Sequence, residues 1–347
     1  MRVFLIVFGL FAYAFPAEAT PYSAPFWLPS GHLQTIYAAT FANIPIVNYR
    51  RERWELTDGD FVDVDWVDLA NQINAESARK AKKDEVNSPI VVVFHGLEGS
   101  SQSGYAKSLM AATQAKGWRG VVIHFRGCSG EPNRLPRVYY AGDVLEIQQL
   151  LARVKEAVPT APIYVAGFSL GGNALLKWLG DSGKDANQII SKAAAISAPI
   201  DLAASAAALD SGLNRILYTP HFVETMRPKA LAMSIRFPGL LDEEKIKRAK
   251  TIHDIDNAVT AVLFGAAGAE DYYAKNASKP HLKNITLPTL ILNAKNDPFV
   301  PATSLPNLSE VSNSVTLEYP ETGGHVGFAG RDNWLAKRLL EFFEMPQ

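Results

Sequence analysis

Short apolar runs alternate with segments of helix length along most of this chain. Eight stretches have the length and pattern of strands: residues 51–56, 61–67, 90–94, 120–125, 163–166, 193–196, 289–292 and 315–319. From residue 90 onward these runs are almost uninterrupted by polar residues, which is typical of strands buried on both faces of a parallel sheet. The pattern therefore predicts an α/β fold, in which a mostly parallel central sheet carries helices on both faces.

The first two strands differ from the others because a tight turn separates them. Asp58-Gly59 lies between residues 51–56 and 61–67, and this dipeptide is a strong signal for a hairpin. We expect the hairpin to supply antiparallel strands at one edge of the sheet. The polar and charged stretch at 71–85 that follows is predicted to be a surface excursion.

A long gap interrupts the alternation. Between Ala198 and Leu287 no strand pattern is evident, although residues 202–209 and 243–250 have helical patterns. A crossover between neighbouring parallel strands needs only about 10–12 residues, so this gap is far too long for one. We predict a helical cap at about residues 200–285, inserted over the carboxyl ends of the strands in a single domain that spans 20–347.

The end of the chain predicts one more helix, at about residues 334–343. It would place Leu335, Leu339 and Phe342 on one face. This spacing is that of an amphipathic helix, so we expect that face to pack on the sheet.

The first nineteen residues form a separate segment. Arg2 precedes the apolar run 3–15 and then Ala17-Glu18-Ala19, the three parts of a secretory signal peptide. About thirteen apolar residues are fewer than the ~20 that span a bilayer. We expect export, periplasmic in a bacterium, with a mature chain from about Thr20. The alternatives are an uncleaved anchor, which alone would bring membrane contact, or a misassigned start, which would leave a cytoplasmic protein.

The composition excludes several other classes of function. The 347 residues carry 34 basic and 35 acidic side chains, a net charge of −1, which gives no reason to expect a nucleic-acid partner. The single cysteine, Cys128, rules out an internal disulfide and a cysteine-rich metal site. No metal, nucleotide or dinucleotide motif is present. We therefore expect neither a metal nor an organic cofactor.

The pentapeptide Gly167-Phe168-Ser169-Leu170-Gly171 predicts the nucleophile. It lies between the strand-like run 163–166 and a helical stretch at 173–179. This strand, turn and helix are the context of a nucleophile elbow, in which a strained serine exposes its Oγ above the sheet. Because roughly one chain in ten of this length contains such a match by chance, the motif needs support from the rest of the sequence.

A serine nucleophile needs a base, and the base needs an orienting acid. In this architecture they follow in the order Ser, Asp or Glu, His. Asp297 follows the strand at 289–292, and His325 follows the strand at 315–319. Each alone is more often a turn or structural residue, but together they complete the order behind three separate strands. Glu321 is a less favoured acid because it shares the loop of the histidine.

The oxyanion of the reaction requires backbone N–H donors. We predict the amide of Leu170, next to the serine, and the amide of Leu97 in the loop after the strand at 90–94. His95 is expected to brace that loop, since no acid partner for it is evident, and Glu98 is expected to be exposed to solvent.

Seven short motifs, spread over nearly everything from about residue 21 to the end, extend this interpretation: GHLQT at 31–35, FHGLEGS at 94–100, FRGCSGEPN at 125–133, GFSLGG at 167–172, DYY at 271–273, NDP at 296–298 and GHVGF at 324–328. Together they resemble the YheT-like hydrolases, a bacterial α/β-hydrolase family related to eukaryotic α/β-hydrolase-domain esterases and lipases.

The resemblance implies an α/β-hydrolase fold and maps Ser169, Asp297 and His325 onto the charge-relay triad of the family. The chain departs from the family's pattern at two places. Residues 1–20 have no counterpart in the soluble, cytoplasmic bacterial relatives, and Asn296 stands where many relatives carry a second Asp.

The sequence thus predicts a serine esterase that hydrolyses a small-molecule ester or acyl substrate. Aromatic residues in the predicted cap suggest a pocket for an acyl group. Two alternatives remain open: an acyltransferase that uses the same triad, and a non-catalytic binding protein with the hydrolase fold.

Overall fold

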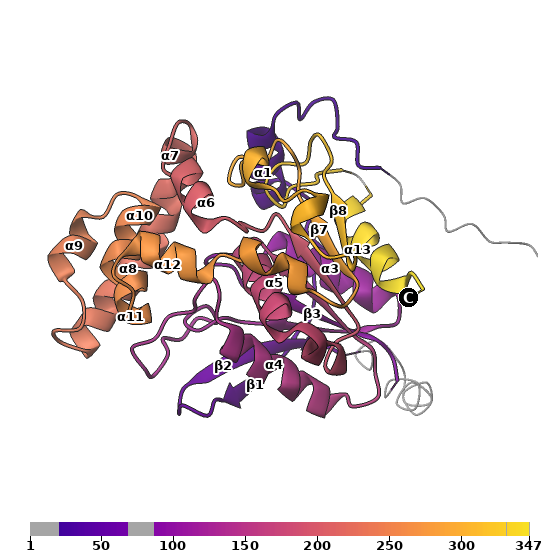
Figure 1. The fold of residues 1–347 in the computed structure, drawn as a ribbon, viewed down its shortest axis with the longest axis horizontal. Coiled ribbons are helices and arrows are strands. Elements are labelled where there is room, and N and C mark those ends of the chain that lie inside the picture. The colour runs from indigo at the N-terminus through magenta and orange to yellow at the C-terminus, as the bar shows by residue number, and fades with distance from the viewer. Residues whose placement is uncertain (1–20, 69–86, 331, 347) are drawn as a thin grey trace, which may run out of the picture.

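The computed structural model describes residues 21–68, 87–330 and 332–346 (Figure 1). The predicted signal segment at 1–19 and the predicted excursion at 71–85 lie outside these residues. Within the described part of the chain, no helix is both long enough and apolar enough to cross a bilayer.

Eight strands form one sheet: β1 (Arg50–Glu55), β2 (Phe61–Val67), β3 (Ile90–Phe94), β4 (Arg119–Ile123), β5 (Ile163–Phe168), β6 (Lys192–Ile196), β7 (Thr289–Leu292) and β8 (Val315–Glu318). Their order across the sheet is β1-β2-β4-β3-β5-β6-β7-β8. Within the run β4-β3-β5-β6-β7-β8, every neighbouring pair of strands is parallel. The prediction of a mostly parallel sheet is confirmed, and every predicted strand is present.

The hairpin lies at one edge, as predicted. β1 pairs antiparallel with β2, and β2 pairs antiparallel with β4. Gly59 at the turn has a φ of 86°, a left-handed conformation that glycine adopts without steric cost. Two cross-strand ion pairs fix the register, Arg51 with Asp65 at 2.8 Å and Arg53 with Asp63 at 2.8 Å.

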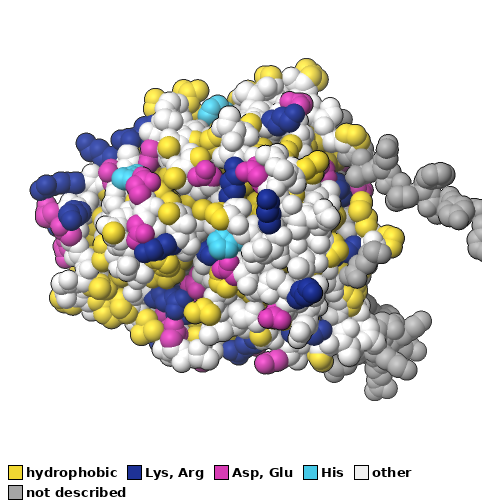
Figure 2. Space-filling view, viewed as in Figure 1, with side chains coloured by type: hydrophobic (Ala, Val, Ile, Leu, Met, Phe, Trp, Pro, Cys, Tyr) yellow, Lys and Arg dark blue, Asp and Glu magenta, His cyan; other side chains and the backbone are white. Residues whose placement is uncertain are grey.

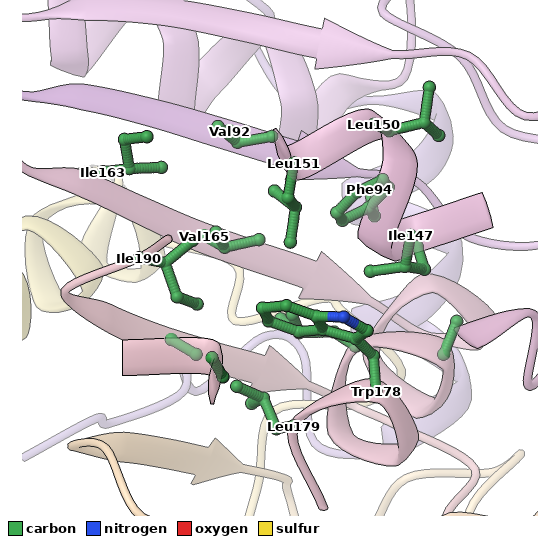
Figure 3. Packing of buried hydrophobic residues seen from close by; sticks show 14 of the residues in the cluster. Val92, Phe94, Ile147, Leu150, Leu151, Ile163, Val165, Trp178, Leu179 and Ile190 are labelled. Carbon is green, nitrogen blue, oxygen red and sulfur yellow. The ribbon is translucent and has the colours of Figure 1, made fainter. Parts of the chain in front are cut away.

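Helices cover both faces of the sheet: α3 (Gly104–Ala115), α4 (Val144–Ala157), α5 (Leu170–Ser182) and α13 (Trp334–Glu344). On one face, side chains of α4 and α5 pack on β3 and β5, with Trp178 at the centre of the cluster in Figure 3. On the other face, α3 and α13 contribute Leu109 and Phe343 to a second cluster. The buried residues of α13 include Leu335, Leu339 and Phe342, so the predicted packing of this helix is confirmed.

Short helices fill the remaining connections: α1 (Gly31–Thr40), η2 (Gly183–Gln188), η4 (Lys279–Asn284), η5 (Ala302–Ser304) and η6 (Leu308–Glu310). Of these, α1 alone reaches the functional site described below. It begins after Ser30, whose side chain accepts a hydrogen bond from the Leu33 amide.

Between β6 and β7 the chain forms a run of helices: α6 (Leu202–Leu209), α7 (Asn214–Leu217), α8 (Thr219–Arg236), α9 (Glu243–Arg248), α10 (Ile252–Ile255), the π-helix η3 (Asp256–Thr260), α11 (Ala261–Phe264) and α12 (Ala269–Asn276). We call residues 202–276 the cap. It lies beside the sheet, at the left of Figure 1. On the face drawn in Figure 2, basic and acidic side chains are interspersed, and hydrophobic ones gather over the cap.

Candidate active site

Ser169 occupies a sharp turn between β5 and α5. Its φ of 50° and ψ of −121° lie in a region that few residues other than glycine adopt. A Cβ atom at Gly167 would lie 2.5 Å from the carbonyl oxygen of Gly171, and one at Gly171 would lie 2.5 Å from that of His95. Glycine is therefore required at both positions, and the predicted strand, turn and helix are confirmed.

The Ser169 side chain meets those of His325 and Asp297, which come from the loops after β8 and β7. The His325 Nε2 atom is 3.0 Å from Ser169 Oγ, and its Nδ1 atom is 3.1 Å and 3.0 Å from the two Asp297 oxygens. With the proton on Nδ1, the imidazole donates to the carboxylate and accepts the serine hydroxyl proton at Nε2. The structure brings the three predicted side chains together. Their catalytic roles stay a prediction.

The carboxylate of Asp297 is enclosed by protein. Its side chain is fully buried, and Oδ1 also accepts hydrogen bonds from the amides of Phe299 at 2.8 Å and Val300 at 3.2 Å. The weaker candidate, Glu321, bonds instead to Lys295, and its side chain is 78% exposed. The geometry thus favours Asp297 as the orienting acid.

Helix α1 supports the loop that carries His325. The His325 amide donates to Thr35 Oγ1 at 2.8 Å, and the Gly323 amide donates to Gln34 Oε1 at 2.7 Å. Asn296 also donates to Gln34 Oε1, at 3.3 Å. Sequence reasoning assigned no role to Gln34 and Thr35. Their only signal was the family-like motif at 31–35, which gave no indication of what they contact.

Two backbone amides beside Ser169 have no hydrogen-bond acceptor among the described residues: those of Leu97 and Leu170. Other amides of the loop are occupied: Gly96 by the Tyr105 hydroxyl at 2.9 Å, Glu98 by the Tyr139 hydroxyl at 2.9 Å and Gly99 by the Gly96 carbonyl at 3.0 Å. Leu97, Leu170 and Ser169 line one cavity. Both amides are thus available to an oxyanion at the serine.

His95 braces this loop from inside the protein. Its Nε2 atom accepts from the Phe125 amide at 3.0 Å, and its Nδ1 donates to the Gly96 carbonyl at 2.7 Å. Burial lowers the pKa of His95 to about 3, so the ring is neutral and has one donor and one acceptor. Because the peptide bond is planar, fixing the Gly96 carbonyl also fixes the direction of the Leu97 N–H. The bracing role expected for His95 agrees with these contacts.

The expectation for Glu98 was wrong. Only 10% of its side chain is exposed, because Tyr139 and the cap residue Lys229 both contact its carboxylate. No local pattern indicates this burial, since the lysine that pairs with Glu98 lies 131 positions further along the chain.

A cavity of about 640 Å³ lies between the serine and the cap. Its lining includes Ser169 and His325 together with apolar side chains such as Leu202, Phe222 and Met233. Cys128 also lines it, but burial raises the pKa of this thiol to about 12, which keeps it un-ionised. A second, larger cavity along α1 reaches the same serine and histidine. No group of three or more potential metal ligands occurs among the described residues.

The sequence profile of the α/β hydrolase fold matches residues 89–332, which is more than half of the chain. The chain belongs to this family. The nucleophile elbow, the mostly parallel sheet and the helices on both faces are the features that this α/β hydrolase shares with it.

Relatives of this α/β hydrolase carry esterase and lipase names. It is 36% identical to "Putative esterase YheT" of Escherichia coli over 318 residues, which cover 90% of this chain and 89% of that protein. It is 28% identical to human "Phospholipase ABHD3", with 90% and 75% covered. An esterase of Pyrococcus furiosus has a similar fold, with a TM-score of 0.54, 16% identity and 88% and 97% of the two chains covered. The resemblance to YheT-like hydrolases is thereby confirmed.

Proposed function

We propose that this α/β hydrolase is a carboxylic-ester hydrolase that acts through an acyl-enzyme on Ser169. One observation carries the proposal. The hydrogen-bonded chain from Ser169 through His325 to Asp297 opens into the same cavity as two unoccupied amides. Activation of the nucleophile and stabilisation of the oxyanion are thus available at one point. A non-catalytic binding protein would have no need to keep all these groups in reactive geometry.

In the first half of the reaction, His325 Nε2 accepts the Ser169 hydroxyl proton while Oγ attacks the ester carbonyl carbon. The carbonyl oxygen becomes an oxyanion that accepts hydrogen bonds from the Leu97 and Leu170 amides. Asp297 stabilises the imidazolium that forms. When the tetrahedral intermediate collapses, the bond to the alcohol oxygen breaks and His325 returns the proton to that oxygen. The alcohol leaves, and the acyl group stays on Ser169.

In the second half, water takes the place of the alcohol. His325 Nε2 accepts a proton from the water as its oxygen attacks the acyl carbon, and the same two amides hold the second oxyanion. Collapse breaks the bond to Ser169 Oγ, which recovers its proton from His325. The products are the free acid and the unchanged enzyme, and no step needs a metal or an organic cofactor.

The cavity beneath the cap supports an apolar acyl group as the substrate part bound there. Its walls are lined by Leu202, Met226, Met233 and Ile252, and such walls stabilise an alkyl chain by removing it from water. The phospholipase name of one relative is consistent with a substrate of this class. A small-molecule ester with an aliphatic acyl chain is the substrate that we propose.

Hydrolysis of p-nitrophenyl esters from acetate to longer acyl chains tests this function. We expect the wild-type protein to release p-nitrophenol and the Ser169→Ala variant to lose at least about 10⁴-fold in kcat. Ser309→Ala, which removes an exposed serine hydroxyl, is the matched control and should retain full activity. An added alcohol distinguishes an acyltransferase, which would form a new ester from the acyl-enzyme. A folded wild-type protein without esterase activity would contradict the proposal.

A further inference from the structure

Glu98 is held in an uncommon conformation next to one of the two oxyanion amides. Its φ of 56° is left-handed, and a residue other than glycine keeps such a conformation only where its surroundings impose it. The Tyr139 hydroxyl accepts from the Glu98 amide at 2.9 Å and donates to the Glu98 carboxylate, Oε1, at 3.1 Å. Burial keeps the pKa of Tyr139 well above its usual value, so this hydroxyl stays protonated and can donate. Tyr139 therefore fixes both the backbone and the side chain of Glu98.

The third contact of Glu98 comes from the cap. The ammonium of Lys229 on α8 lies 2.7 Å from Glu98 Oε2, and 49% of the lysine side chain is exposed, against 10% for Glu98. The residues on either side of this lysine, Pro228 and Ala230, line the cavity above Ser169. The ion pair between Lys229 and Glu98 thus connects α8, whose residues line the cavity, to the loop that carries the Leu97 amide.

The position of the pair gives it a consequence for catalysis. Gly96, on one side of Leu97, is fixed from the core by His95 and Tyr105, whereas Glu98, on the other side, is fixed by Tyr139 and Lys229. The Leu97 N–H is an effective donor only if its position relative to the oxyanion is held to within about 0.5 Å. Displacement of Glu98 would shift the Cα atom of Leu97, at which the Gly96–Leu97 peptide ends. The Leu97 N–H would then leave the alignment that His95 gives it, and its hydrogen bond to the oxyanion would weaken in the transition state.

We propose that Lys229 is a positioning residue, whose ion pair with Glu98 aligns the Leu97 amide for the oxyanion when α8 is seated over the cavity. The inference rests on the proposed hydrolase function and assigns to the cap a part in the chemical step as well as in substrate binding. Lys229 itself contacts neither the serine nor the reacting carbonyl in this account. It acts through Glu98.

Steady-state kinetics of Lys229→Met with a p-nitrophenyl ester tests the proposal. Complete loss of one oxyanion donor costs about 10²–10³ in kcat, so a misaligned donor should cost about 5- to 50-fold, with KM within about twofold. Lys229→Arg preserves the ion pair and should restore kcat. In Lys247→Met, the matched control, another cap lysine loses its ion pairs with Glu243 and Glu244, and both kinetic constants should stay unchanged.

A double-mutant cycle identifies the partner. Glu98→Gln should lower kcat to a similar extent, and the double variant should be no slower than the worse single variant, because both changes break one interaction. Additive losses would overturn the proposal. So would an unchanged kcat in Lys229→Met, or a rise in KM alone, which would make Lys229 a substrate contact.

Hydrogen exchange of the peptide that covers residues 95–99 provides a readout that does not depend on turnover. We expect faster exchange of the Glu98 and Gly99 amides in Lys229→Met than in the wild type or Lys247→Met, because these amides lose protection when the loop moves. Unchanged exchange would overturn the coupling. If Lys229→Met exchanges faster but the wild-type protein hydrolyses no ester, the coupling between Lys229 and the loop stands and the proposed function is contradicted.

Discussion

At the scale of single residues, the site depends on strain that its surroundings stabilise. The left-handed backbone of Ser169 costs about 1–3 kcal/mol. Two hydrogen bonds hold this backbone in place: the Ser169 amide donates to the Ile196 carbonyl, and the Ser169 carbonyl accepts from the Gly172 amide. In this conformation the Ser169 Oγ atom projects to the imidazole of His325 instead of capping α5.

Asp256 is a second buried acid, separate from Asp297, and it belongs to the part of the cap that lines the cavity at Ser169. Its carboxylate accepts from the Thr260 hydroxyl at 2.7 Å and the Tyr273 hydroxyl at 2.7 Å, and no cation compensates its charge within hydrogen-bond distance among the described residues. Burial raises the pKa of Asp256 to about 6. The folded protein therefore keeps this proton to a higher pH than the unfolded chain does.

This shift predicts a pH-dependent effect of Asp256→Asn. Because the folded pKa lies above the usual 3.8, the folded state holds the extra proton between about pH 4 and 6, and stability is lost as the pH rises through that window. Relative to the wild type, the free energy of unfolding of Asp256→Asn should rise by about 2–3 kcal/mol between pH 4 and 7.5. Urea unfolding at both pH values measures the difference, and a difference independent of pH would contradict the assignment.

The sequence was sufficient to predict which three side chains meet, but not which residues support them. Ser169, Asp297 and His325 each follow a strand in a required order, so the motif around Ser169 and the order of the strands together indicated their positions. The roles of Gln34 and Thr35 were not predicted, because a neutral side chain that accepts a hydrogen bond from a backbone amide produces no periodic or charge pattern in the sequence. The burial of Glu98 was misjudged since its lysine partner comes from the distant cap.

At the scale of elements, α1 acts as a brace between the start of the described chain and the His325 loop. Gln34 is fully buried, and its side-chain nitrogen donates to the Leu28 carbonyl at 2.7 Å while its oxygen accepts from the Gly323 amide. One amide side chain thus joins the first part of the described chain to a loop 289 positions further along. The position of the imidazole depends on this helix as much as on its own loop.

Replacement of Gln34 by Leu, which has a similar volume, should therefore affect both stability and catalysis. It leaves the Gly323 N–H and the Leu28 carbonyl buried without partners, at a cost of about 2–5 kcal/mol in the free energy of unfolding. We also expect kcat to fall about tenfold or more, because a 1 Å displacement of a catalytic group costs up to about 10²-fold. Urea denaturation and ester hydrolysis measure the two effects. Gln149→Leu, at an exposed position of α4, is the control, and equal behaviour of the two variants would refute the bracing role.

The elements themselves were predicted well from the sequence because their signals are local. Continuous apolar runs located the strands, and Asp58-Gly59 located the hairpin turn. The order of the strands in the sheet and the contacts between α8 and the loop after β3 could not be predicted in the same way. They depend on which buried faces fit together, and a single sequence does not encode this as a pattern.

At the scale of the whole molecule, the cap and the sheet form one cavity between them. The loops at the strand ends contribute Ser169 and the amides of Leu97 and Leu170, whereas α6, α8 and α10 contribute apolar walls. Under the proposed function, the apolar wall residues of the cap select the acyl chain, whereas the reacting groups lie on the side of the sheet. A change in one of these apolar wall residues should alter which acyl chains are accepted without altering the reaction of a short ester.

Ala230→Phe tests this division, because Ala230 is buried on α8 and lines the cavity. The added ring should occupy acyl space and lower kcat/KM for the longest good substrate at least about tenfold relative to the acetate ester. Ala274→Phe places the same ring on an exposed part of the cap and should leave the ratio unchanged. A chain-length profile that is identical in wild type and Ala230→Phe would place the acyl chain elsewhere, such as the cavity along α1.

Covalent labelling with a fluorophosphonate, followed by peptide mass spectrometry, shows whether Ser169 is the nucleophile. We expect the wild-type protein to gain one phosphonyl group on Ser169, the hydroxyl next to His325 Nε2, and the folded Ser169→Ala variant to gain none. A folded wild-type protein that stays unlabelled, or a label on any other residue, would contradict the assignment of Ser169 as the nucleophile.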